Sequence, residues 1–169
     1  STTGFATANY DAWPNFSRGI LFLLMFVGGC AGSTSSSIKV SRLIVLFRAT
    51  KMELHQLIYP RSITKITYNG KTLQTSTVSH MMFYLVIFVA ITFVSGLLLT
   101  ACGMDSVGAV SASLSCISNV GPGFGSVCAA ENYAAVAAFG KYVLMFKMLV
   151  GRLELLTVLV LFVPYASVR

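Results

Sequence analysis

The chain has 169 residues, of which 56% are hydrophobic and only 10% are charged, with a formal net charge of +7. A soluble domain usually contains about 25% charged residues, because it needs them to cover its surface. The composition therefore excludes soluble enzymes, disordered proteins and secreted disulfide scaffolds, and it predicts an integral membrane protein.

The first 59 residues contain one apolar segment that is interrupted. No residue between Arg18 and Lys39 is charged, but the apolar run over residues 19–27 is followed by three Gly and five Ser or Thr. A helix resumes near Ile38 and is expected to end about Tyr59, before Pro60. Broken membrane helices often mark ion sites, so the hydroxyl-rich stretch predicts a gate across a pore. Composition equally allows a kinked helix whose hydroxyls bond its own carbonyls.

Most of the positive charge follows this segment. Seven of the twelve basic residues lie between positions 39 and 71, with Glu53 as the only acid among them: Lys39, Arg42, Arg48, Lys51, Arg61, Lys65 and Lys71. Such an excess of Lys and Arg is typical of cytoplasmic connections in membrane proteins. We therefore expect residues 60–75 to be a cytoplasmic linker. We expect no nucleic-acid partner, because such a partner needs basic residues spread over a folded face.

The rest of the chain predicts four elements. Residues 76–101 contain no charge and are long enough to span a bilayer as a helix. Residues 105–117 are small and predict a short helix capped by Asp105. Residues 118–125 contain Pro and three Gly and cannot continue that helix. Residues 134–163 predict a last helix with charges that are costly at membrane depth: Lys141, Lys147, Arg152 and Glu154.

This order, a long helix, a short helix, a Gly-rich extended segment and a long helix, is typical of the pore-loop unit of cation channels. Carbonyl oxygens aimed into a narrow pore replace the water of a cation, and glycine allows the backbone angles that this needs. An ordinary extracellular turn is the alternative. We expect one selectivity filter at Asn119, Val120, Gly121 and Pro122. The opening segment precedes a membrane helix in the same way and predicts a second filter at Thr2, Thr3, Gly4 and Phe5.

The cysteines and the enzyme motifs give weaker signals. The four Cys residues form no C-x-x-C pair, so a zinc site is not expected and buried apolar thiols are. The spacing leaves a Cys102–Cys128 bridge open. The Gly70-Lys71-Thr72 sequence lacks the upstream glycine of a phosphate-binding loop, and no G-x-S-x-G occurs, so no enzymatic activity is predicted.

Four segments together resemble the C-terminal part of the TrkH/TrkG/KtrB superfamily of bacterial potassium uptake subunits. They are STTGFATANY at residues 1–10, GGCAGST at 28–34 with Ile38 and Lys39, SNVGPGFG at 118–125, and MLVGRLEL at 148–155. The family fold is a set of four helix–pore-loop–helix units around one pore. The chain would hold about one and a half of them, divided as residues 1–59, 60–75 and 76–169, and would be a fragment of a longer protein.

The resemblance also implies functional roles. The key filter glycines would be Gly4 and Gly121, and the filter carbonyls would bind potassium without an organic cofactor. Arg152 would face the gate loop beneath the filter. That loop comprises Gly28, Gly29, Cys30, Ala31, Gly32, Ser33, Thr34, Ser35, Ser36 and Ser37. Family members often have glycines where this chain has its last three serines, which leaves the flexibility of the gate open.

The same resemblance implies a homodimer in the bacterial cytoplasmic (inner) membrane, in contact with lipid and with a TrkA-type cytosolic nucleotide-binding regulator. Two alternatives remain at this point. One is a sodium-coupled or less selective cation transporter of the same superfamily. The other is a non-conducting membrane scaffold or regulatory subunit. The sequence does not distinguish coupling to protons, to sodium or to neither.

Overall fold

The computed structural model describes residues 2–30, 32–33, 35–59, 66–68 and 70–153. Within them the regular secondary structure is helical apart from a small hairpin. The α-helices are α1 (Asn15–Phe26), α2 (Val40–Ile58), α3 (Thr75–Ala101), α4 (Ser106–Ile117) and α5 (Ala138–Arg152). The hairpin joins β1 (Thr67–Tyr68) to β2 (Lys71–Thr72), and single 3₁₀ turns lie at Tyr10–Ala12, Gly125–Val127 and Tyr133–Ala135.

Helix α3 is the element long and apolar enough to cross a membrane among the described residues. Its 27 residues extend over about 40 Å, more than the ~30 Å of a bilayer core. Large apolar side chains are exposed along it, including Phe83, Val86, Phe93 and Leu97. A soluble protein avoids such an apolar surface, whereas a helix that faces lipid or a neighbouring membrane helix needs one.

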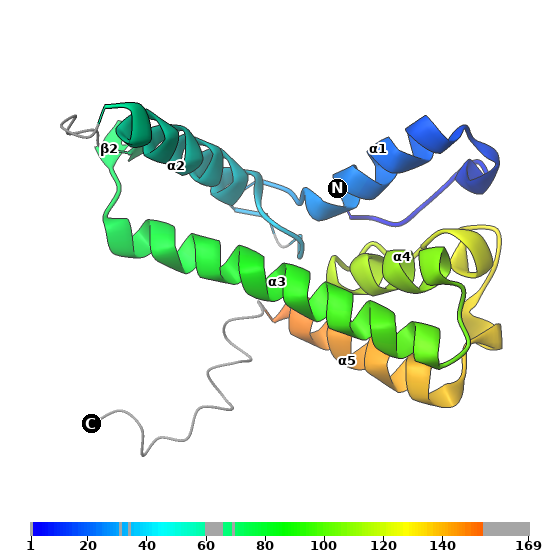
Figure 1. The fold of residues 1–169 in the computed structure, drawn as a ribbon. Coiled ribbons are helices and arrows are strands. Elements are labelled where there is room, and N and C mark those ends of the chain that lie inside the picture. Colours follow the sequence, from blue (N-terminus) through cyan, green and yellow to red (C-terminus); the bar gives the residue numbers. More distant parts are fainter. Residues whose placement is uncertain (1, 31, 34, 60–65, 69, 154–169) are drawn as a thin grey trace, which may run out of the picture.

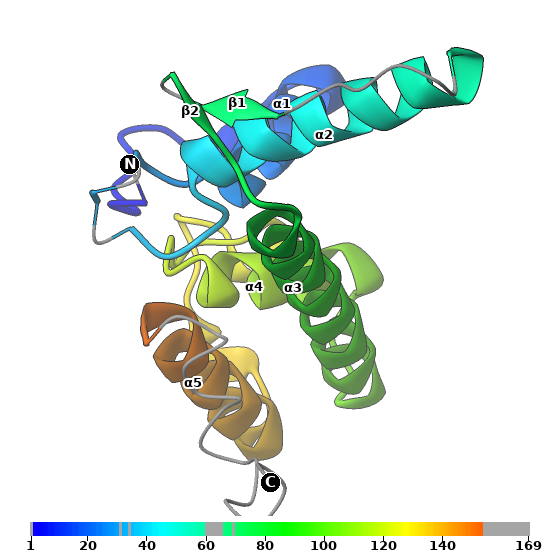
Figure 2. The same ribbon diagram turned by 90° about the vertical axis from the view of Figure 1, so that its left-hand side faces the viewer.

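Helix α4 lies at the centre of the fold, between α1 on one side and α3 and α5 on the other (Figures 1 and 2). Nine of its twelve residues are buried although the helix is too short to span a membrane. Small side chains allow this close approach: Val110 lies 3.3 Å from the position of a Cβ on Gly96 of α3. Asp105 occupies the N-cap position, but its side chain makes no capping hydrogen bond, so the predicted cap interaction is wrong.

The two ends of the loop between α1 and α2 lie side by side. Val27 and Ile38 form an isolated parallel bridge, and the Gly28 amide donates to the Ile38 carbonyl at 2.9 Å. Backbone hydrogen bonds therefore join the two ends of the loop over residues 28–37. The interrupted segment that the sequence predicts consists of two separate helices, α1 and α2. Ala31 and Thr34 lie outside the described residues.

The remaining elements differ in detail from the sequence expectation. Residues 66–72 contain the hairpin, and the Arg48 guanidinium on α2 donates to the Thr67 carbonyl. Helix α5 begins at Ala138, four residues after the predicted start, because Tyr133–Ala135 form a 3₁₀ turn first. The predicted continuation over 154–163, with Glu154, lies outside the described residues. All four cysteines are free thiols; Cys116 and Cys128 are buried, but the prediction of burial is wrong for Cys30, which is exposed, and for Cys102, which is half-buried.

Helix α5 packs closely against the end of α4. A Cβ on Gly151 would lie 2.1 Å from the Ile117 carbonyl oxygen, nearer than any side chain can approach backbone. Only glycine fits there, which places the last turn of α5 directly beside the point where α4 ends and residues 118–125 begin.

Candidate functional site

The two predicted filter segments share one backbone pattern. In the first, Thr2 and Gly4 have φ of 55° and 75°; in the second, Asn119 and Gly121 have φ of 53° and 102°. Left-handed residues at alternate positions are rare in a chain and are strained for a non-glycine residue. An extended strand points successive carbonyls to opposite sides, whereas alternation in the sign of φ turns them towards one side. Both segments therefore have the geometry that a row of carbonyl ligands requires.

The two segments also touch. A Cβ on Gly4 would lie 2.0 Å from the Val120 carbonyl oxygen, so no side chain is possible there. A cavity of about 260 Å³ is lined by residues 2–5 from one segment and by Val120 and Pro122 from the other. At Gly121 no atom lies within 4 Å of the position that a Cβ would take, so this glycine is required by its φ alone. Phe5 also borders this cavity and is 96% exposed.

The electrostatics at the second segment favour a cation. Helix α4 ends at Ile117, two residues before Asn119. The carbonyl end of a helix has a partial negative charge that stabilises a nearby positive ion. Ser118, at the junction, is fully buried, and its hydroxyl has no hydrogen-bond partner among the described residues.

A layer of side chains outside the filters joins the two segments. The Tyr10 hydroxyl donates to the Gly123 carbonyl at 2.7 Å, and the Gly125 amide donates to Asp11 at 3.3 Å. Asp11 also forms an ion pair with Arg18 at 2.8 Å. Burial raises the pKa of Tyr10 to about 12, so its hydroxyl remains a donor at physiological pH.

Two further hydroxyls bond carbonyls of the second segment. Tyr133 donates to the Gly121 carbonyl at 2.6 Å, and Ser115 donates to the Pro122 carbonyl at 2.7 Å. Burial also raises the pKa of Tyr133 above its ordinary value. Two of the four carbonyls predicted as ion ligands in this segment thus already accept a hydrogen bond from the protein. Sequence reasoning missed Tyr133, because nothing in its local pattern indicates which carbonyl it reaches.

The serine hydroxyls of the 28–37 loop make two kinds of hydrogen bond. The Ser37 hydroxyl donates to the last carbonyls of α1, those of Met25 at 2.9 Å and Phe26 at 2.6 Å. Ser35 accepts from the Thr2 hydroxyl and from the Gly29 amide, both at 3.2 Å. The Ser37 contacts agree with the expectation that hydroxyls bond helix carbonyls, whereas Ser35 and Ser36 contact Thr2 and Asn119 of the predicted filters; the gate interpretation stays a prediction.

Asn119 connects the second segment to this loop and to α5. Its side-chain amide donates to the Ser36 hydroxyl at 2.9 Å and to the Met148 carbonyl at 3.2 Å. The predicted filter, the predicted gate loop and the last helix therefore meet at one side chain.

Arg152 lies beside the same loop. A cavity of about 330 Å³ is lined by Arg152 together with Ser33 and the three consecutive serines 35–37. Two more cationic residues, Lys39 and Arg42, line it as well, and the Arg42 guanidinium stacks on the Tyr84 ring at 4.3 Å. The structure thus brings Arg152 and the loop together, as the resemblance implied, and adds two positive charges that sequence reasoning did not place there. Cys30 and Gly32 lie at the exposed tip of the loop.

Lys147 is the most buried charged residue that the sequence left without a role. It is 3% exposed, and its ammonium group donates to the Ser95 hydroxyl of α3 and to the hydroxyl and the carbonyl of Ser113 on α4. One cation thus joins three helices at the middle of the bundle. The sequence indicated that a charge at this depth in the last predicted helix costs free energy, but it did not indicate which oxygen atoms would accept its hydrogen bonds.

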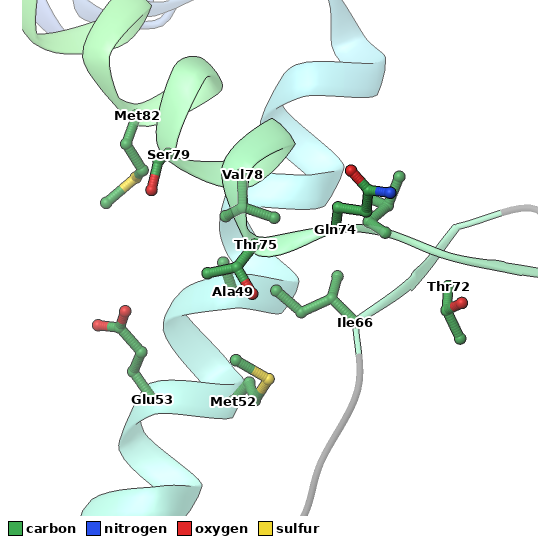
Figure 3. Close-up of a pocket in the computed structure, with 11 residues that line it drawn as sticks. Ala49, Met52, Glu53, Ile66, Thr72, Gln74, Thr75, Val78, Ser79 and Met82 are labelled. Atoms are coloured by element: carbon green, nitrogen blue, oxygen red, sulfur yellow. The ribbon is translucent and has the colours of Figure 1, made fainter.

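A third cavity lies away from the two predicted filter segments. It has about 630 Å³ and is bordered by Ala49, Met52 and Glu53 of α2, by the hairpin region, and by the first turns of α3 (Figure 3). Within the described part of the chain, no three His, Cys, Asp or Glu residues come together as a metal site.

Comparison with known proteins assigns the family. Residues 1–168 match the model of the TrkH family, described as cation transport proteins. The chain belongs to the TrkH family. It is 35% identical over 164 residues to the Trk system potassium uptake protein TrkH of Salmonella typhimurium, covering 97% of this chain and 34% of that protein. It is 31% identical over 159 residues to TrkG of Escherichia coli, covering 94% of this chain and 32% of that protein.

The fold agrees with this family. The crystal structure of the potassium transporter TrkH from Vibrio parahaemolyticus superimposes with a TM-score of 0.87 at 37% identity, over 96% of this chain and 34% of that one. The predicted resemblance and the helical membrane fold class are thereby confirmed. The chain spans about a third of the length of these TrkH relatives.

The hydrogen bonds of Lys147 predict a large effect on stability. Lys147→Ala in the full-length protein removes a buried side chain and leaves the oxygens of Ser95 and Ser113 without their donor. We expect a loss of about 2–4 kcal/mol in the free energy of unfolding. The measurement is thermal unfolding of the purified protein in detergent. Lys141→Ala is the matched control, because Lys141 is on the same helix and reaches only the Ala134 carbonyl at the surface. Equal melting temperatures for the two variants would contradict the conclusion that the hydrogen bonds of Lys147 stabilise the contact between the three helices.

Proposed function

We propose that the full-length protein is the pore-forming subunit of a potassium uptake system in the bacterial inner membrane. This chain would supply two of its filter segments and its gate loop. The observation that supports this best is the repeated φ pattern at Thr2/Gly4 and Asn119/Gly121, in two segments that meet at the carbonyl end of a buried short helix. The names of the relatives, potassium uptake proteins of Trk systems, agree with this proposal.

In this proposal potassium loses its water at carbonyls of residues 2–5 and 119–122. Carbonyl oxygens compensate for lost hydration only if they converge on the ion, which the alternating φ values favour. Glycine at both key positions supports a preference for potassium over sodium. A sodium-coupled or less selective transporter of the same family is the second candidate, because two further filters of such a pore would lie outside this chain.

The loop over residues 28–37 would then act as the gate below the filters, with Arg152 beside it. A fixed positive charge near a cation path raises the barrier to conduction, and more strongly where water is excluded. Opening requires the loop to leave the Ser36–Asn119 and Ser35–Thr2 contacts. The loop is joined directly to α2, so movement of α2 would be transmitted to it.

Partners follow from the same placement. The exposed basic residues of α2 would face the cytosol, as would the cavity between α2 and the start of α3 (Figure 3). A TrkA-type nucleotide-binding regulator would dock on this side and move α2. A homodimer and lipid contacts along α3 complete the proposed assembly. The alternative of a non-conducting scaffold does not explain the strained backbone at the two filter segments, and no enzymatic role is proposed.

The test of function is growth. The full-length gene should restore growth of a potassium-uptake-deficient bacterial strain at low potassium, with sodium as the competitor. Gly121→Ser should fold, since the space around its Cβ is open, but its φ of 102° becomes strained and the carbonyl row shifts. We expect the preference for potassium over sodium to fall about tenfold, which corresponds to ~1.4 kcal/mol of lost discrimination.

Gly19→Ala serves as the control for this variant, because Gly19 is exposed on α1 and nothing lies within 4 Å of its Cβ position. Failure of the full-length gene to restore growth would contradict the transport function. Unchanged selectivity of Gly121→Ser would remove this glycine from the filter.

Arg152→Ala tests the gate. Removal of the charge from the cavity beside the serine loop should lower the barrier for cations and raise the basal flux of rubidium several-fold in proteoliposomes. Lys141→Ala, which removes a charge from the other end of α5, should leave the flux unchanged. Equal basal flux in wild type and Arg152→Ala would count against a gating role for this arginine.

A further inference from the structure

Tyr133 makes a contact that the proposed function does not account for. It lies in the turn before α5, and its hydroxyl donates to the carbonyl oxygen of Gly121 at 2.6 Å. Its ring packs against a cluster of buried residues: Leu99, Ala109, Ala112, Cys116, Val127, Val136 and Leu144. Packing of the ring against these residues therefore fixes the position of the hydroxyl.

The Tyr133 hydroxyl supplies a hydrogen bond that holds the direction of the Gly121 carbonyl. The Gly121–Pro122 peptide is planar, so its carbonyl direction changes only when the whole unit rotates. Gly121 has no Cβ, and no atom lies within 4 Å of where one would be, so no side chain at residue 121 restrains that rotation. The ring of Pro122 fixes the φ angle on the other side of the unit, but Pro122 has no amide hydrogen and makes no hydrogen bond through its nitrogen. The hydroxyl of Tyr133 is thus the side-chain group that acts directly on the oxygen of this carbonyl.

We propose that Tyr133 is a positioning residue that sets the ion selectivity of this segment by fixing the Gly121 carbonyl. An oxygen that accepts a short hydrogen bond from a buried hydroxyl is a weaker ligand for an ion. The number and the strength of the carbonyl ligands are the quantities on which discrimination between potassium and sodium depends. Ser115, which donates to the Pro122 carbonyl, does the same for the next position. This inference rests on the proposed function of residues 119–122 as a filter.

The test is Tyr133→Phe in the full-length protein, which removes one oxygen and keeps the ring. Potassium and sodium fluxes are measured in proteoliposomes with equal amounts of purified protein. The lost hydrogen bond should lower the potassium-to-sodium preference about fivefold, while the potassium flux at saturation changes less. A merely structural role would lower both fluxes together and leave their ratio unchanged. Tyr142→Phe is the matched control, because Tyr142 lies on the exposed face of α5 and is 69% exposed.

Ser115→Ala provides a second test in case Tyr133→Phe does not accumulate, and it should shift the same ratio in the same direction. With a potassium-selective wild type, an unchanged ratio in Tyr133→Phe, or in Ser115→Ala where Tyr133→Phe does not accumulate, would overturn the proposal that hydroxyls bonded to these two carbonyls set the selectivity, and it would leave the proposed function standing. Absence of potassium flux in the wild type would overturn both.

Discussion

The side chain of Asn119 is the contact on which the proposed pore depends. Its backbone is in the left-handed region, which asparagine tolerates better than most residues. That conformation begins the filter segment at the end of α4, and the same residue extends its amide to Ser36 of the loop and to the Met148 carbonyl of α5. A residue that could not adopt this backbone, or that lacked two donors, would separate the three elements. The proposed filter segment and the proposed gate loop are therefore linked through one amide group.

The rest of the bundle holds this junction in place. Gly151 allows α5 to approach the end of α4, and Lys147 joins α5 to Ser95 and Ser113 deeper in the bundle. Outside the filters, Tyr10 and Asp11 join the two pore segments across more than a hundred residues of sequence. The two proposed filter segments are thus held by contacts from α4, from α5 and from the turn at Tyr10–Ala12. Backbone hydrogen bonds hold the two ends of the 28–37 loop, whereas the hydroxyls of Ser35 and Ser36 connect it to the proposed filter segments.

The sequence predicted the elements better than the contacts. Helix α3 and the short buried helix α4 begin and end within one residue of the prediction, because uncharged length and small-residue composition are local signals. The placement of Arg152 beside the loop followed from family resemblance and not from composition. Tyr133 and Lys147 were missed, since their partners are hydroxyls and carbonyls on other helices that no spacing rule identifies. Asp105 failed as a capping residue because N-cap preference does not fix the side-chain conformation.

The link between filter and gate is tested most directly by a double-mutant cycle on Asn119→Ala and Ser36→Ala in the full-length protein, with basal rubidium flux in proteoliposomes as the readout. If the hydrogen bond between these side chains holds the loop closed, each single variant raises the flux and the double variant raises it no further than the larger single effect. Independent effects that multiply in the double variant, or no change in flux in any of the three, would contradict the coupling of the gate loop to the filter.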